Sequence, residues 1–177
     1  MNKRLSFLLI FLAAAQLSFS QKTIQAPAGI SVNAYSGMLF YQKPGFTIKD
    51  VGLNINFLFF YRSSNTKLNT AGLGYGWSHS YNIYYVEKGN DIEIVKGNGI
   101  SHLFTDNTGS NQFESSAGNS DTLIFNSGNN EYLLQTKEGD QFFFSDITHK
   151  KVTQIKDKHN NTISLAYNPG ETLPNKI

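Results

Sequence analysis

Histidine is the residue type in this chain best suited to metal binding or acid–base catalysis, and it occurs at His79, His102, His149 and His159. No two histidines have the short spacing, such as His-x-x-x-His, that brings two ligands to one metal ion. His79 lies on the apolar face of a predicted strand, which indicates a core histidine with one satisfied hydrogen bond. His159 lies in a predicted turn and is expected to be exposed. The histidines therefore predict no metal site.

Two further patterns have the residue types for hydrolysis. Ser78, His79 and Ser80 are adjacent and suggest a nucleophile beside a base. Neighbouring residues of a strand point to opposite faces, so neither serine is placed in line with the imidazole. Asp91 and Glu93 share a strand face, but they lie beside a predicted turn, where a solvated face is expected. We predict a non-enzymatic protein with no catalytic, cofactor-binding or metal-binding residue.

A glycine-rich run, GLGYGWSHSYNIYY at residues 72–85, raises the alternative of a phosphate-binding loop. Such a loop needs a helix N-terminus and a Lys-Ser/Thr pair behind it, and the run has neither. The residues after it alternate as in a β-strand. One face of that predicted strand consists of Trp77, His79, Tyr81, Ile83 and Tyr85. The glycines therefore predict a bend at which the backbone passes close beneath a large aromatic side chain.

The residues expected to matter structurally at this bend are Gly74, Gly76, Trp77 and Tyr81. Trp77 is the only tryptophan of the chain. If its indole is buried, Trp77→Ala should lower the free energy of unfolding by about 3–5 kcal/mol.

The N-terminus has the pattern of a secretory signal peptide. Lys3 and Arg4 precede an apolar run from Leu5 to Ala15, and small residues, including Ser20, mark a cleavage site. The run is short for a membrane span, which needs about 20 apolar residues, although an uncleaved anchor is the alternative. We predict cleavage after Ser20 and export to the periplasm, the cell surface or the medium, with no integral membrane span afterwards.

Charge and cysteine content exclude several function classes. The chain has 15 Lys+Arg and 13 Asp+Glu, and residues 1–20 contain two of the basic residues and no acidic one. The processed chain is therefore neutral and has no basic cluster, which argues against nucleic acid and anionic membranes as partners. The chain contains no cysteine, so disulfides, Cys-based zinc sites and thiol catalysis are excluded.

Composition and periodicity predict an all-β fold. The chain has 14 Phe and 9 Tyr, and no helical period of ten or more residues follows the signal peptide. Residues 53–61, LNINFLFFY, alternate as a strand that becomes buried on both faces, with Phe57 and Phe59 in the core. The uncharged FLFFY portion would promote aggregation at a sheet edge, so we expect a neighbouring strand to cover it.

Three hairpins are predicted further along, at residues 92–104, 132–144 and 152–167, with turns at Gly97–Gly99, Glu138–Gly139 and His159–Asn161. They look like degenerate copies of one unit. Within residues 107–130 only Asp121–Phe125 is predicted as a strand, flanked by loops. The expected architecture is an antiparallel meander of hairpins forming an open, twisted, spiral-type sheet, preceded by a signal helix. The expected divisions are a signal peptide at 1–20, a linker at 21–29, a β domain at 30–168, and a tail or a further repeat at 169–177.

Four segments resemble RHS/YD-repeat proteins. Residues 32–39, 53–65 and 72–85 are similar to the "VN..TG.L", "L.L.RTYNS" and "G.GW.HSY...L" motifs of that family, and residues 151–168 resemble its "L..I.D.NGN.I.L.Y" repeat unit. The matching positions of the third motif are Gly74, Gly76, Trp77, His79, Ser80 and Tyr81. The pattern is not matched everywhere, because His159-Asn160-Asn161 stands at the Asn-Gly turn and Tyr167-Asn168 replaces the Tyr-Asp pair. The sequence also stops where another repeat would be expected to begin.

The resemblance implies a structural role. Family members wind many repeats into a hollow β-shell, which in many of them encloses a C-terminal toxin or effector. This chain would be the N-terminal module of such a shell, with downstream repeats or a separate shell chain and a polypeptide cargo as partners. The self-cleaving aspartates of the family lie beyond the repeats and have no counterpart in residues 1–177. The alternative is a secreted or surface adhesion module that binds carbohydrate or protein through Tyr35, Tyr41 and Tyr84. A third alternative is an exported hydrolase, which would need acidic or histidine side chains converging in a pocket.

Overall fold

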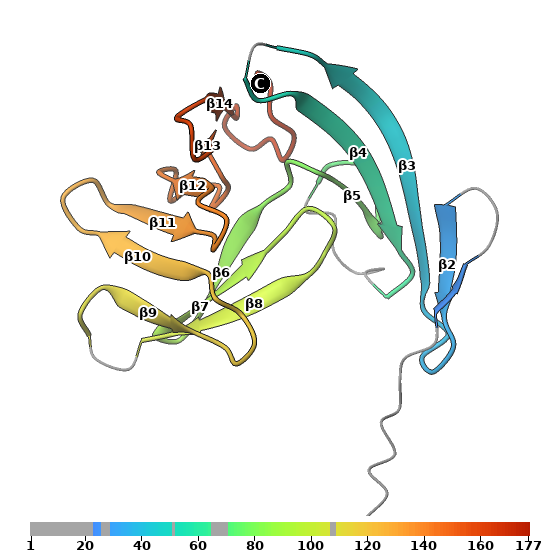
Figure 1. Ribbon diagram of the computed structural model, residues 1–177, viewed down its shortest axis with the longest axis horizontal. Helices are drawn as coiled ribbons and strands as arrows, with labels where there is room; N and C mark the ends of the chain where they lie inside the picture. Colours follow the sequence, from blue (N-terminus) through green and yellow to red (C-terminus); the bar gives the residue numbers. More distant parts are fainter. Residues whose placement is uncertain (1–22, 26–28, 51, 65–70, 107–108) are drawn as a thin grey trace, which may run out of the picture.

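The computed structural model describes residues 23–25, 29–50, 52–64, 71–106 and 109–177. The predicted signal peptide lies outside the described residues. Fourteen β-strands and no α-helix occur in the described part of the chain (Figure 1), which confirms the all-β prediction. Across these same ranges, no helix has the length and apolar character needed to cross a membrane.

The first five strands form one antiparallel sheet whose strand order follows the chain. They are β1 (Thr23–Gln25), β2 (Ile30–Asn33), β3 (Leu39–Ile48), β4 (Ile55–Arg62) and β5 (Trp77–His79). β1 falls within the range assigned to a linker and pairs with β2. β3 and β4 arch together along one side of the molecule (Figure 1). β4 has a neighbour on each side, so its FLFFY portion is covered as predicted.

The remaining nine strands form a second antiparallel meander, also in chain order. They are β6 (Tyr84–Lys88), β7 (Asp91–Val95), β8 (Ser101–Thr105), β9 (Gln112–Ser115), β10 (Thr122–Asn126), β11 (Glu131–Gln135), β12 (Gln141–Phe144), β13 (Gln154–Lys156) and β14 (Thr162–Ser164). This sheet curls into a half-barrel (Figure 1). The curl brings its first strand back to the segment between β12 and β13.

Backbone hydrogen bonds fix that approach. The N–H of Tyr85 donates to the carbonyl of Lys150, and the N–H of Val152 donates to the carbonyl of Ile83, each over 2.9 Å. An ion pair of 2.8 Å between Lys150 and Glu87 lies beside them. The edge of β6 is therefore partly covered, which removes part of an exposed strand edge.

The prediction of one continuous strand from Trp77 to Tyr85 was wrong. β5 ends at His79 and β6 begins at Tyr84, and the two strands belong to different sheets. A turn separates them, in which the N–H of Asn82 donates to the carbonyl of His79 over 2.9 Å. The alternation of large and small residues continues across the turn, so periodicity alone cannot reveal the break.

The prediction that loops flank the strand near Asp121–Phe125 was also wrong on one side. β9 pairs with both β8 and β10. Its only large apolar residue is Phe113, which packs against Tyr132 with ring centroids 5.9 Å apart. Its neighbours in the sheet, and not its own hydrophobic pattern, establish this strand.

The three predicted hairpins are confirmed, and their turns share one hydrogen-bond pattern. In each five-residue turn, at 96–100, 136–140 and 157–161, the first N–H donates to the last carbonyl and the fourth N–H donates to the first carbonyl. The fourth residue has positive φ in every case, at Gly99 (79°), Gly139 (96°) and Asn160 (67°). Asn160 therefore takes the left-handed conformation that glycine takes in the other two turns.

Both sheets contribute to one hydrophobic core. Its buried members include Phe57 from β4, Ile94 from β7 and Leu134 from β11. Phe57 and Phe60 lie on opposite faces of β4 and are both buried, which confirms the core position predicted for Phe57. The predicted burial of both faces at the end of the strand is only partly confirmed, because Phe59 and Tyr61 are half-buried; Phe59 packs against the core. The core fixes the two sheets against each other and positions the groups described next.

Candidate functional site

The glycine run forms a bend that leads into β5, as predicted. Gly72, Gly74 and Gly76 have φ values of 70°, 98° and 78°. A Cβ atom on Gly76 would lie 2.7 Å from the ring of Tyr61 and 2.9 Å from the carbonyl oxygen of Arg62. The backbone therefore passes against a large aromatic ring, which confirms the role assigned to this glycine. A strand, and not a helix, follows Gly76, so the bend lacks the aligned N–H groups of a phosphate-binding loop.

Trp77 is half-buried. The predicted loss of about 3–5 kcal/mol in unfolding free energy for Trp77→Ala required a fully buried indole. Its indole packs against Tyr61 with ring centroids 5.3 Å apart and against Tyr41 with centroids 6.2 Å apart. These contacts join β3, β4 and β5. Trp77 therefore stabilises the five-stranded sheet through aromatic contacts on its face.

His79 is fully buried, as predicted, but its expected hydrogen bond is absent. Neither ring nitrogen has a hydrogen-bond partner. The imidazole stacks on Phe57 with centroids 4.9 Å apart. Burial, followed by the charge of Lys151, lowers the pKa of His79 to about 4. His79 is consequently neutral at physiological pH and acts as a flat apolar group in the core.

The serines beside His79 are engaged elsewhere, as the strand geometry predicted. The hydroxyl of Ser80 donates to the carbonyl of Asn56 over 2.7 Å, and Ser78 accepts a hydrogen bond from the Asn82 side-chain amide over 3.1 Å. Because neither serine bonds to the imidazole, no nucleophile–base pair exists at this position.

The turn between β7 and β8 packs against the junction of the two sheets. A Cβ atom on Gly97 would overlap the carbonyl oxygen of His79, and one on Gly99 would lie 3.0 Å from the side chain of Arg62. Two hollows lie beside this turn, and both include Phe60 and Asn98 in their walls. One measures about 510 Å³ and contains Arg62, and the other measures about 300 Å³.

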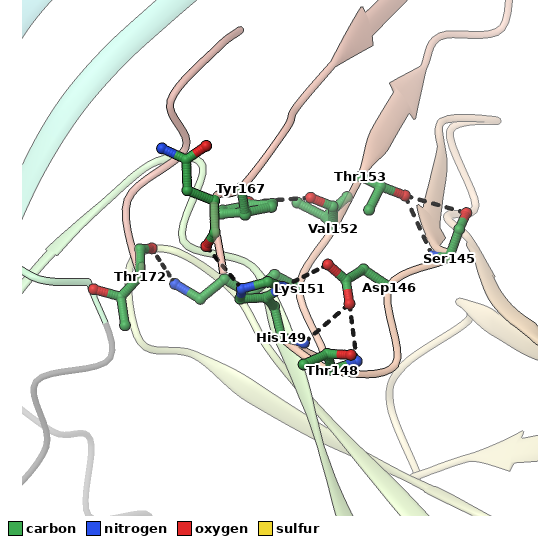
Figure 2. Close-up of polar contacts among 10 residues, drawn as sticks. Ser145, Asp146, Thr148, His149, Lys151, Val152, Thr153, Tyr167 and Thr172 are labelled. Atoms are coloured by element: carbon green, nitrogen blue, oxygen red, sulfur yellow. Dashed lines mark hydrogen bonds and ion pairs between the residues drawn. The ribbon is translucent and has the colours of Figure 1, made fainter. Parts of the chain in front are cut away.

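A polar cluster joins the curled sheet to the C-terminal segment (Figure 2). Lys151 is 5% exposed, and its ammonium group donates to Asn82 over 3.0 Å. The same group donates to the carbonyl of Thr172. The ammonium also lies 5.6 Å from the ring centroid of Tyr167, whose hydroxyl donates to the carbonyl of Val152 over 3.1 Å. Burial lowers the pKa of Lys151 to about 8. This lysine therefore connects three separate parts of the chain.

His149 and Asp146 form the second part of the cluster (Figure 2). The Nδ1 atom of His149 lies 2.5 Å from the Asp146 carboxylate, and its Nε2 atom lies 3.1 Å from the carbonyl of Asn168. Partial burial acts to raise the pKa of Asp146, but hydrogen bonds from His149 and Thr148 outweigh it and lower that pKa. Because both ring nitrogens are engaged within the protein, this pair holds the chain in place and presents no base to a substrate.

The acidic residues considered for catalysis do not converge. Asp91 accepts a hydrogen bond from the N–H of Asp106, and Glu93 forms an ion pair of 3.6 Å with the exposed Lys88. No group of three potential metal ligands occurs among the described residues. The structure therefore does not assemble the sequence candidates into one reactive centre.

Three polar residues of this region were not predicted from the sequence to be notable. Lys151 and Asn82 are buried polar groups that bond to each other, and Arg62 lies at the end of an aromatic strand. One feature of the sequence could have drawn attention to Arg62: it is one of only two arginines in the chain, and the other, Arg4, lies in the predicted signal peptide.

Comparison with known families gives one match. A family model described as a domain of unknown function (DUF6531) matches residues 29–104. The matched range includes the glycine bend, Arg62 and the turn between β7 and β8. No curated protein matches the chain.

Proposed function

We propose that this chain is an exported, non-enzymatic structural module of an RHS/YD-repeat-type shell that encloses a polypeptide toxin or effector. One observation carries the proposal: every strand within each sheet pairs with its neighbours in sequence, and the nine-stranded sheet curls as it adds strands. A wall built in this way can lengthen by further hairpins without rearranging those already formed. The shared geometry of the turns at 96–100, 136–140 and 157–161 supports such repetition.

The last strand of the nine-stranded sheet offers the place for extension. In the antiparallel pairing of β14 with β13, the backbone N–H and C=O groups of Ile163 and Leu165 point toward β13. Those of Ser164 point outward, away from β13. Two residues beyond Ser164, the N–H of Ala166 donates to the carbonyl of Lys176 over 3.1 Å, and the carbonyl of Ala166 accepts from the N–H of Asn175 over 2.9 Å, on that same outer side. A further strand, from downstream repeats or from a separate shell chain, would continue along this line. Enclosure would keep the cargo from solvent and from its targets, since a closed wall of paired strands leaves no free edge.

Sedimentation velocity of the processed chain tests whether this edge accepts a strand. The wild-type chain should associate as its concentration rises, because an unpaired edge templates further pairing. Ser164→Pro removes an outward N–H while leaving the bonds to β13, and it should abolish the association. Ser164→Ala is the matched control and should behave as the wild type. Concentration-independent monomers of all three proteins would contradict the proposal.

An adhesion module is the second candidate, and the exposure of Tyr35, at 86%, is the observation that favours it. The other two tyrosines considered for adhesion, Tyr41 and Tyr84, are half-buried. A glycan array separates the two functions. Saturable glycan binding by a stable monomer, lost in Tyr35→Ala, would support adhesion and oppose the shell.

A further inference from the structure

Arg62 is a half-buried cation with one unsatisfied donor, its Nε atom. Its guanidinium carbon lies 5.4 Å from the ring centroid of Phe40, and its buried Nε atom has no hydrogen-bond partner. No ion pair joins Arg62 to a carboxylate among the described residues. Burial lowers the pKa of Arg62, yet a guanidinium stays protonated at physiological pH. A buried donor without an acceptor is costly, so the guanidinium keeps hydrogen-bonding capacity for an anionic group.

The residues around Arg62 form one wall of the 510 Å³ hollow. Phe40 pairs with Ser31 on one side and with Arg62 on the other, and Gln42 pairs with Phe60, so these side chains share a face of the five-stranded sheet. Asn98 and Ile100, from the turn between β7 and β8, line the other side. The hollow has the volume of a typical ligand pocket.

The second hollow adjoins the first and is lined by less polar side chains. It shares Phe60 and Asn98 with the first, and its further walls include Leu134, Phe142 and Ile155. Lys96, which forms an ion pair of 3.4 Å with Asp121, also lines the second hollow. A cationic, partly polar hollow thus borders a mostly apolar one. A ligand that fills both needs an anionic group at one end and an apolar group beside it, which an extended peptide provides through alternate side chains, since these point to the same face.

We propose that these two hollows bind an extended polypeptide segment in which a carboxylate side chain contacts Arg62 and the apolar side chain two residues further on occupies the second hollow. A carboxylate matches the planar guanidinium fork and accepts two parallel hydrogen bonds from it. Phe40 holds one face of the guanidinium, which orients the fork. The inference rests on the proposed function only for the source of the segment, which would be the enclosed polypeptide.

Binding of a labelled acetyl-Glu-Leu-Phe-Leu-amide peptide to the processed chain tests the inference by fluorescence anisotropy. The matched peptide with Gln in place of Glu should bind about tenfold or more weakly, since it lacks the charge-assisted pair. Arg62→Gln should weaken the Glu peptide to the level of the Gln peptide. Arg62→Lys should give an intermediate affinity, because lysine keeps the charge but loses the fork.

Lys156→Gln is the control, because Lys156 also lies over an aromatic ring, 5.5 Å from the centroid of Phe143, but does not line either hollow. It should leave peptide affinity unchanged. Equal affinity of the Glu and Gln peptides for the wild-type chain would overturn the inference. Free glutarate competing as well as the peptide would also overturn it, because the ligand would then be a small carboxylate. A negative peptide-binding result would not change the sedimentation result expected for Ser164→Pro. Failure of this inference can therefore be distinguished from failure of the shell proposal.

Discussion

His79 stacks on Phe57 with the two rings 4.9 Å apart and inclined by 11°, and no hydrogen bond reaches either nitrogen of the imidazole. The contact joins β4 and β5 at the point where the chain leaves the first sheet for the second. The stack is compatible only with the neutral imidazole, because a buried imidazolium without an acceptor is strongly disfavoured.

This relationship predicts that acid begins to destabilise the fold at a pH above the range of carboxylate protonation. The pKa of His79 falls from 6.5 to about 4 on folding, so the unfolded chain binds the extra proton between these values. Stability is therefore lost as the pH falls from 6.5 to 4, by up to about 3 kcal/mol. Urea unfolding of the wild type and of His79→Leu at pH 7, 5.5 and 4.5 measures the effect.

The His79→Leu profile should be nearly flat over this interval. His159→Gln, which removes an exposed imidazole, is the control and should keep the wild-type slope. A slope that persists in His79→Leu would show that another group is responsible.

The glycine bend provides a matched pair of substitutions. Gly74 and Gly76 both have positive φ, but a Cβ atom at Gly74 meets nothing within 4 Å, whereas one at Gly76 would overlap Tyr61. Gly74→Ala should therefore cost about 1–2 kcal/mol for backbone strain alone. Gly76→Ala should cost at least about 1 kcal/mol more, because overpacking adds to the strain. Equal losses in denaturant unfolding would refute the close contact with Tyr61.

Trp77 and Phe57 should differ in their contributions to stability. Phe57 is 9% exposed and lies in the core, so Phe57→Ala should cost about 3–5 kcal/mol. Trp77 is half-buried, so Trp77→Ala should cost about 2 kcal/mol through lost aromatic contacts. If chemical denaturation shows that Trp77→Ala loses more unfolding free energy than Phe57→Ala, the indole of the protein in solution is more buried than the structure shows.

Lys151 should control the protection of the C-terminal segment. Lys151→Met keeps the length of the side chain but removes the donors to Asn82 and Thr172. Hydrogen exchange around Tyr167–Thr172 should accelerate about tenfold, which corresponds to a loss of about 1.4 kcal/mol in local stability. Lys158→Met, at an exposed turn position, is the control. Unchanged exchange in Lys151→Met would mean that other contacts hold this segment.

The sequence predicted those parts of the fold that depend on local rules. Turn residues with positive φ located the hairpins, including the one in which Asn160 replaces glycine. Likewise, the absence of a helix pattern after Gly76 correctly predicted a strand and a close aromatic neighbour.

Features that depend on distant partners were not predictable. β9 exists because β8 and β10 lie on either side of it, and its own residues carry one large apolar side chain. The break after His79 leaves the alternating pattern intact, so only the placement of two sheets reveals it. Arg62 and Lys151 became notable only when the fold enclosed them with groups that lie far away in the sequence.

The most direct test of the shell proposal is to purify, from the native host, the assembly that contains this chain and to image it by electron microscopy with and without protease. The proposal predicts a hollow β-walled particle whose inner polypeptide survives protease until the wall is opened. An open chain whose associated polypeptide is digested at the same rate before and after opening would contradict it.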